Sequence, residues 1–220
     1  MGEWIYRTDL HADWMSLMFF LNLLFILALF KIDPNRFKSL INILGSIVYF
    51  GKYSNDRELN YFSFFNMFSF FIITNSLALG YFSLSIYNIQ SMELGFEFFY
   101  LLLGLVFVLS IRYLIVHAFC KELNIKHKIK ILFFKNFTYA TQYSIVLLGL
   151  LFLWNYSTIP LLFIESIIGV LLILWVVNQF RLFFSFIKSH TNDVIYIFLY
   201  LCTFKIAPWF WVYYVFIETN

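Results

Sequence analysis

The sequence predicts an all-α integral membrane protein, with six transmembrane helices and one amphipathic interfacial helix on the cytoplasmic side. Hydrophobic residues make up 62% of the 220 residues and charged residues only 12%, whereas soluble domains carry about 25% charged residues. Apolar runs with few charges recur along the whole chain, and each is long enough for a helix to cross about 30 Å of hydrocarbon. We therefore expect a single transmembrane domain over residues 1–220 and no separate water-soluble domain.

The first apolar run, at about 14–30, follows a short polar tail that lacks the positively charged start of a secretory signal. Because Lys31 and Pro34 follow this run in place of a small-residue cleavage site, we interpret it as an uncleaved first span. Pro160 opens the fifth span at a first-turn position, where proline is well tolerated. The five later spans are expected at about 61–87, 93–119, 137–154, 160–180 and 193–216.

The longest predicted connection, 31–60, contains the amphipathic helix, which we expect at about 35–50. Its apolar residues recur at i, i+3, i+4 and i+7: Phe37, Leu40, Ile41 and Leu44. Arg36 and Lys38 lie beside this stripe, a pattern that is typical of a helix in the membrane interface. Two roles fit the pattern, namely packing beneath the bundle and binding a lipid or partner, and we favour packing.

Basic residues sort the predicted connections onto two sides. Those after the first, third and fifth spans carry lysines and arginines, whereas the turns after the second and fourth carry none. The positive-inside rule therefore places the basic connections in the cytoplasm and both termini outside. Aromatic residues near the predicted outer boundary agree, because Trp and Tyr favour membrane interfaces. They are Trp4, Tyr6, Trp14, Tyr81, Tyr87, Trp154, Tyr156, Trp209, Trp211, Tyr213 and Tyr214.

Ionisable side chains inside or near the edge of the predicted hydrocarbon are the candidate functional residues. They are Glu97, Arg112, Glu165 and Lys205. A charge at that depth is costly and is by default a hypothesis of function. Glu165 and Lys205 fall on neighbouring spans, so they could pair. Such a pair would either line an ion or substrate path or hold the register of the two helices, and we favour the second role. Pro208, beside Lys205, marks a kink in the last span.

No catalytic residue, metal or cofactor is predicted. His117 and Cys120 are spaced at i, i+3, but two ligands without others at suitable spacing are a weak metal pattern. Cys120 and Cys202 fall in or beside predicted spans, so we expect no structural disulfide. The chain has no nucleophile elbow, metalloprotease helix, phosphate loop or dinucleotide fingerprint. Its net charge of +3 is too small and too dispersed to indicate a nucleic-acid partner.

The last span contains the stretch Leu199-Tyr-Leu-Cys-Thr-Phe-Lys-Ile-Ala-Pro208. It resembles the closing motif of domain-of-unknown-function family 4271, a family of polytopic inner-membrane proteins of Bacteroidota. That motif has tyrosine, leucine, cysteine, two further residues, an acidic residue, and a proline three positions on. Tyr200, Leu201, Cys202 and Pro208 match it. Lys205 stands at the acidic position with the opposite charge, so a role that needs a carboxylate there is not carried over.

The resemblance implies a bacterial inner-membrane location and brings no known activity. It also implies membership in an envelope complex, because those bacteria build gliding and secretion machines. Our first hypothesis is thus a non-enzymatic membrane subunit or assembly factor, with the lipid bilayer and other membrane-protein subunits as partners. The second is a small transporter or channel that uses Glu165 and Lys205. The third is a membrane enzyme acting on a lipid-linked substrate.

Overall fold

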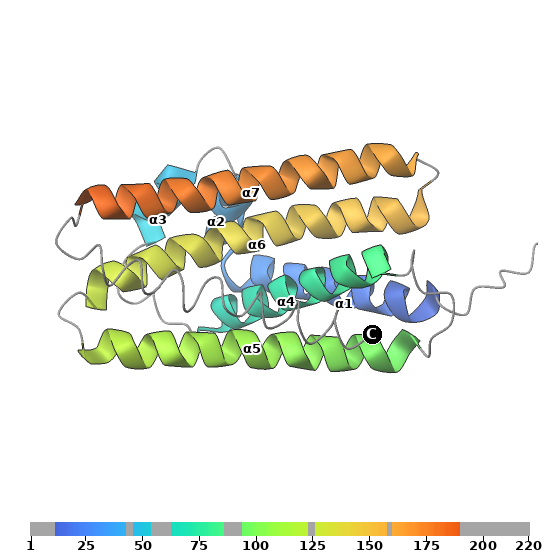
Figure 1. Ribbon diagram of the computed structural model, residues 1–220, viewed down its shortest axis with the longest axis horizontal. Helices are drawn as coiled ribbons and strands as arrows, with labels where there is room; N and C mark the ends of the chain where they lie inside the picture. Colours follow the sequence, from blue (N-terminus) through green and yellow to red (C-terminus); the bar gives the residue numbers. More distant parts are fainter. Residues whose placement is uncertain are drawn as a thin grey trace, which may run out of the picture.

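The computed structural model describes residues 12–42, 46–53, 63–85, 94–122, 126–157 and 160–189, and these form a helical bundle (Figure 1). Every regular element in these ranges is a helix, so the predicted all-α class is confirmed. The helices are α1 (Ala12–Ile32), α2 (Pro34–Ile41), α3 (Ser46–Tyr53), α4 (Phe64–Ser85), α5 (Leu94–Glu122), α6 (Lys126–Tyr156) and α7 (Leu161–Ser189).

Four stretches of the described helices are long and apolar enough to cross a membrane. They are Trp14–Ile32, Phe64–Ser83, Lys130–Tyr156 and Leu162–Leu182, which correspond to the first, second, fourth and fifth predicted spans. The third predicted span corresponds to α5, and the described part of that helix contains the apolar stretch Phe98–Ile111. The sixth, at 193–216, lies outside the described residues, as does the Leu199–Pro208 motif.

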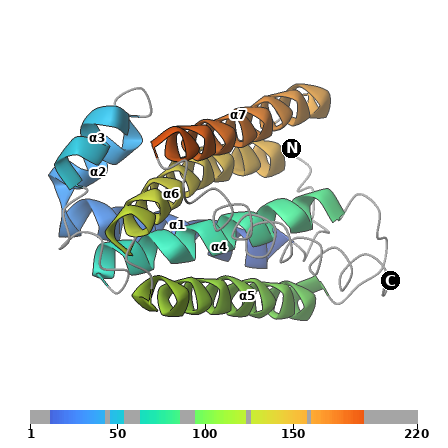
Figure 2. The same cartoon turned by 60° about the vertical axis from the view of Figure 1, so that its left-hand side comes forward.

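The five long helices lie along the long axis of the bundle and alternate in direction (Figure 1). α1, α5 and α7 end where α4 and α6 begin, and α2 and α3 lie at this same end (Figures 1 and 2). We call it the basic end, because lysines and arginines fall in the helix segments nearest to it: Lys31, Arg36, Lys38, Lys52, Lys121, Lys126, Lys128, Lys130, Lys135, Arg181 and Lys188. These basic helix segments thus gather at one end of the bundle. The side of a membrane that this end would face stays a prediction.

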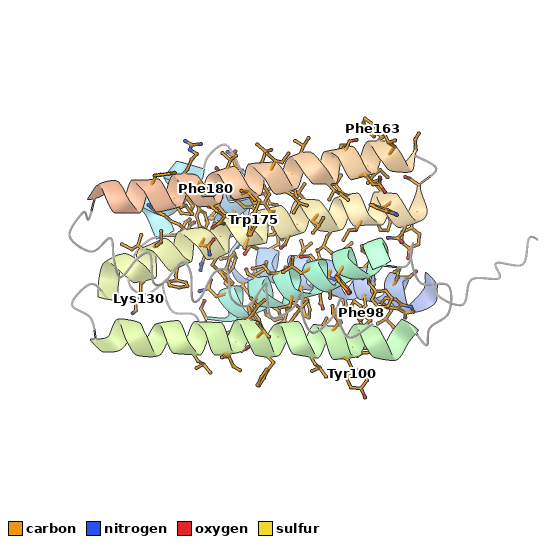
Figure 3. All side chains as sticks on the ribbon, in the orientation of Figure 1. Phe98, Tyr100, Lys130, Phe163, Trp175 and Phe180 are labelled. Atoms are coloured by element: carbon orange, nitrogen blue, oxygen red, sulfur yellow. The ribbon has the colours of Figure 1, made fainter. Side chains whose placement is uncertain are left out.

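α4 is the central helix of the bundle and contacts α1, α5 and α6. Its side chains Ile72, Ala78 and Leu79 have no exposed surface. α5 buries Phe98 completely but leaves Tyr100 72% exposed, and Figure 3 shows Tyr100 directed away from the bundle. The core therefore lies around α4, between α1, α5 and α6.

At the end opposite the basic end, Trp14 joins three helices. Its ring centroid lies 5.2 Å from that of Phe82 on α4 and 4.8 Å from that of Phe98 on α5. The Ser16 Oγ and Tyr156 Oη atoms lie 2.5 Å apart and link α1 to α6. Trp14, which the sequence placed in an interfacial belt, thus packs against the core, because aromatic partners on α4 and α5 surround it.

α6 and α7 extend beyond the predicted spans at the basic end. α6 begins at Lys126, so the lysine-rich segment that the sequence predicted as a connection is helical. Phe133, Phe134 and Phe137 are buried there and pack this first part of α6 onto the bundle. Lysine is also a good helix former, so the polar composition does not end the helix.

Residues 35–50 do not form the single helix that the sequence predicted. Asp33 caps α2 through its carboxylate, and Pro34 occupies the first turn. Asn42 then leaves helical geometry, with φ −74° and ψ 86°, and α3 begins at Ser46. The break allows α3 to pack against α2 (Figure 2). We call α2 and α3 together the helical hairpin.

Candidate functional site

The main polar site in the described part of the chain centres on a buried arginine at the basic end. Arg36 is only 2% exposed. Its Nε donates to the Tyr49 hydroxyl at 3.0 Å, and its Nη2 donates to the Asn66 Oδ1 at 3.1 Å. Its guanidinium carbon lies 4.1 Å from the centroid of the Phe65 ring. We call Arg36, Tyr49, Phe65, Asn66 and Gln142 the Arg36 cluster.

The local sequence directs Arg36 inward. Asp33 accepts a hydrogen bond from the backbone N–H of Arg36 at 2.9 Å, which sets the first turn of α2. Arg36, Phe37 and Leu40 then form the buried face of that helix. The arginine is therefore placed toward the bundle by the same turn that starts α2.

Tyr49 and Asn66 come from two further helices. Tyr49, on α3, is 1% exposed, and its ring stacks on Phe134 of α6 with a centroid separation of 5.9 Å and an interplanar angle of 10°. Asn66 lies in the first turn of α4 and is 5% exposed. One guanidinium thus ties α2 to α3 and to α4.

Gln142 adds a contact from α6. Its Nε2 donates to the backbone oxygen of Leu40 at 2.6 Å. The last carbonyls of a helix have no partner within that helix, so this amide caps the end of α2. The Gln142 Oε1 is buried and makes no hydrogen bond within the described part of the chain. The hairpin is therefore fixed at the start of α2 by Asp33 and at its end by α6.

The cluster fixes a positive charge but does not transfer protons. Its partners Tyr49, Asn66 and Phe65 are neutral, and they orient the guanidinium of Arg36 toward α3 and α4. An arginine side chain stays protonated in proteins. Burial raises the pKa of the Tyr49 phenol, although the Arg36 charge and hydrogen bonds oppose that shift. The Tyr49 phenol is therefore neutral at physiological pH and does not serve as a base.

We expect the contribution of Tyr49 to stability to disappear at alkaline pH. Burial raises its pKa above the ordinary 10.0, so this contribution is complete below about pH 10 and is lost as pH rises through the folded-state pKa. At neutral pH, Tyr49→Phe should cost about 1.5–3 kcal/mol, because the hydroxyl accepts a hydrogen bond from the charged Arg36 guanidinium. Thermal unfolding of both proteins in detergent would check this, and the gap between them should shrink above about pH 10. A gap that widens there would contradict the expectation.

Buried polar side chains also line the contacts among α1, α4 and α6. They are Asn22, Asn66, Ser69, Thr74, Asn75, Ser76, Ser83, Thr138, Thr141, Gln142 and Ser144. Several hydroxyls donate to carbonyls of their own helix, as Ser69 does to Phe65 and Thr141 to Phe137, both at 2.9 Å. Small polar residues bonded in this way allow helices to approach closely in a membrane bundle.

Of the four predicted intramembrane charges, only Glu165 has a described side chain. It is exposed in the second turn of α7, beside the exposed Leu162. Glu97 and Arg112 lie on α5, but their side chains lie outside the described part of the structure, as do Lys205 and Pro208 entirely. The Glu165–Lys205 pair stays a prediction.

The Arg36 cluster was not predicted from the sequence. The sequence placed Arg36 beside the apolar stripe of the amphipathic helix, as one of the basic residues of the membrane interface, yet it is buried. Its spacing of four residues from Leu40 was the available signal, because residues at i and i+4 share a helix face. Tyr49, Asn66 and Gln142 carry no comparable signal, because their role depends on helices that are distant in the sequence.

Comparison with known proteins gives one match. A family model described as a domain of unknown function (DUF4271) matches residues 15–216, nearly the whole chain. This confirms the family resemblance that the Leu199–Pro208 motif indicated. No curated protein and no solved structure matches the chain.

Proposed function

We propose that this chain, which belongs to the DUF4271 family, is a non-enzymatic membrane subunit or assembly factor of a larger bacterial cell-envelope complex. In this proposal the chain crosses the inner membrane six times, with the basic end in the cytoplasm and both termini in the periplasm. Gliding or protein-secretion machinery is the class of complex that we propose.

The outer surface of α7 is the observation that carries this proposal. α7 packs mainly on α6, and many of its large apolar side chains are exposed in the described part of the chain. Leu162 is 76% exposed and Ile173 is 64% exposed, and Phe163 points outward from the helix (Figure 3). Exposed apolar side chains in this number fit lipid or the helices of a partner rather than water.

The basic end supports the proposal in a second way. The Arg36 cluster holds the helical hairpin in one position against α4 and α6. Lys31, Lys38 and Lys52 are exposed there. A fixed surface with charges loses less freedom on binding than a flexible loop does, which favours a docking role.

Site-specific photo-crosslinking in native membranes would test the proposal. We expect a photoreactive residue at Ile173, on the exposed face of α7, to give an adduct with another membrane protein. The same residue at Leu79, which has no exposed surface, is the matched control and should give none. Affinity purification in mild detergent should recover that same partner at constant stoichiometry.

Two results would count against a subunit role. One is a purified protein that contains only this chain, as a monomer or homo-oligomer. The other is a set of Ile173 adducts that consists of lipid or of a second copy alone. Either would leave the transporter hypothesis, for which Lys205→Leu is the first variant to test. Glu165 gives that alternative less support, because its side chain is exposed on α7.

A further inference from the structure

The helical hairpin and the end of α1 carry an unbalanced charge. Residues 31–53 contain the cations Lys31, Arg36, Lys38 and Lys52 and one anion, Asp33. The Asp33 carboxylate accepts the hydrogen bond that caps α2, and Arg36 is buried. The segment therefore presents three exposed lysines, against one half-buried carboxylate that is engaged at the start of α2.

Exposed apolar side chains lie close in sequence to two of these lysines. Lys38 and Ile41 are spaced at i, i+3 on α2, and both are exposed. Ile41 is 51% exposed. At the last turn of α1, Lys31 and Ile32 are likewise exposed, and Ile32 has an exposed fraction of 46%. We call Lys31, Ile32, Lys38, Ile41 and Lys52 the hairpin surface.

This combination fits the boundary between the headgroups and the acyl chains of a bilayer. A lysine stem lies along apolar surface while its ammonium group reaches outward. Isoleucines beside it would contact acyl chains, as the apolar face of an interfacial helix does. Anionic headgroups attract a basic segment of this kind more strongly than zwitterionic ones.

Helix-end electrostatics account for part of the pattern. Lys31, Lys38 and Lys52 each fall in the last turn of their helix, where a cation is favoured by the helix dipole. That effect does not explain why exposed isoleucines accompany the lysines. It also does not explain why the Arg36 cluster ties α2 to α3, α4 and α6 at this end of the bundle.

We propose that the hairpin surface binds the headgroups of anionic phospholipids. The three ammonium groups contact headgroup phosphates, and Ile32 and Ile41 contact the adjacent acyl chains. This inference rests on the membrane location proposed above and not on the existence of protein partners. The Arg36 cluster serves the lipid site as a support that holds α2 and α3 in place.

Titration of the purified full chain with phosphatidylglycerol and with phosphatidylcholine, followed by native mass spectrometry, would test the proposal. We expect tighter binding of phosphatidylglycerol, weakening as salt is added. The triple variant Lys31→Gln, Lys38→Gln, Lys52→Gln should lose about fivefold in affinity per lysine, or roughly a hundredfold in total. Its melting temperature without lipid should fall by only about a few degrees, because the three side chains are exposed and each loses only a helix-end charge interaction.

The matched control removes three other lysines near the basic end, as Lys121→Gln, Lys126→Gln, Lys128→Gln. It should keep most of the preference for phosphatidylglycerol. The proposal is overturned if the wild type binds both lipids equally, or if the hairpin variant keeps its preference. It is also overturned if the control loses as much affinity, since the effect would then be general charge. Failure here leaves the crosslinking of α7 to a partner unaffected, so the two proposals fail separately.

Discussion

Arg36→Ala is expected to lower the free energy of unfolding by about 3 kcal/mol or more. Two hydrogen bonds to a charged group are lost, and each contributes about 1.5–3 kcal/mol. The contact of the guanidinium with the Phe65 ring, at 4.1 Å, is lost as well. The Tyr49 hydroxyl and the Asn66 amide would be left buried with fewer partners. Chemical or thermal unfolding in detergent measures this difference directly.

Two further variants at α2 give that experiment its controls. Lys38→Ala removes a cation from the exposed face of the same helix and should change stability by no more than about 0.5 kcal/mol. Arg36→Lys keeps the charge but lacks the planar, forked donor set that reaches both Tyr49 and Asn66. We expect it to lie between the wild type and Arg36→Ala. Equal stability of Arg36→Ala and Lys38→Ala would refute a structural role for the cluster.

Ile173→Lys is expected to impair membrane insertion of α7. Ile173 is 64% exposed and lies near the middle of the apolar stretch Leu162–Leu182. A lysine at the centre of a membrane helix costs about 2.5–3.5 kcal/mol on insertion-based scales, whereas an exposed lysine on a soluble helix costs little. The yield of membrane-integrated protein, measured in vitro or in cells, should fall accordingly.

Phe184→Lys is the matched control for this substitution. Phe184 has a similar exposed fraction, 65%, but lies beyond the apolar stretch of α7 at the basic end. A lysine there would reach the interface, so we expect near-normal insertion. If Ile173→Lys and Phe184→Lys insert equally well, the exposed face of α7 does not lie in hydrocarbon, and the membrane assignment of this helix is wrong.

The spans of α1 and α4 illustrate what sequence pattern predicts well. Both helices agree closely with the predicted runs at 14–30 and 61–87. The hydrophobicity of a run is a property of its own residues, and a helix that crosses a bilayer needs about 20 of them. The start of α6 was harder to predict. The segment Lys126–Asn136 is rich in lysine, yet it is helical because buried phenylalanines pack it onto the bundle.

The sequence by itself determined the all-α class, most of the apolar helices and the family. It also determined that basic residues follow the first, third and fifth predicted spans. These follow from composition and short-range spacing, which do not depend on how the helices pack. Only the tertiary structure decided that Arg36 is buried, that Trp14 joins the core and that the hairpin breaks at Asn42. The burial of an arginine depends on partners supplied by α3, α4 and α6, and these helices meet it only once the chain has folded.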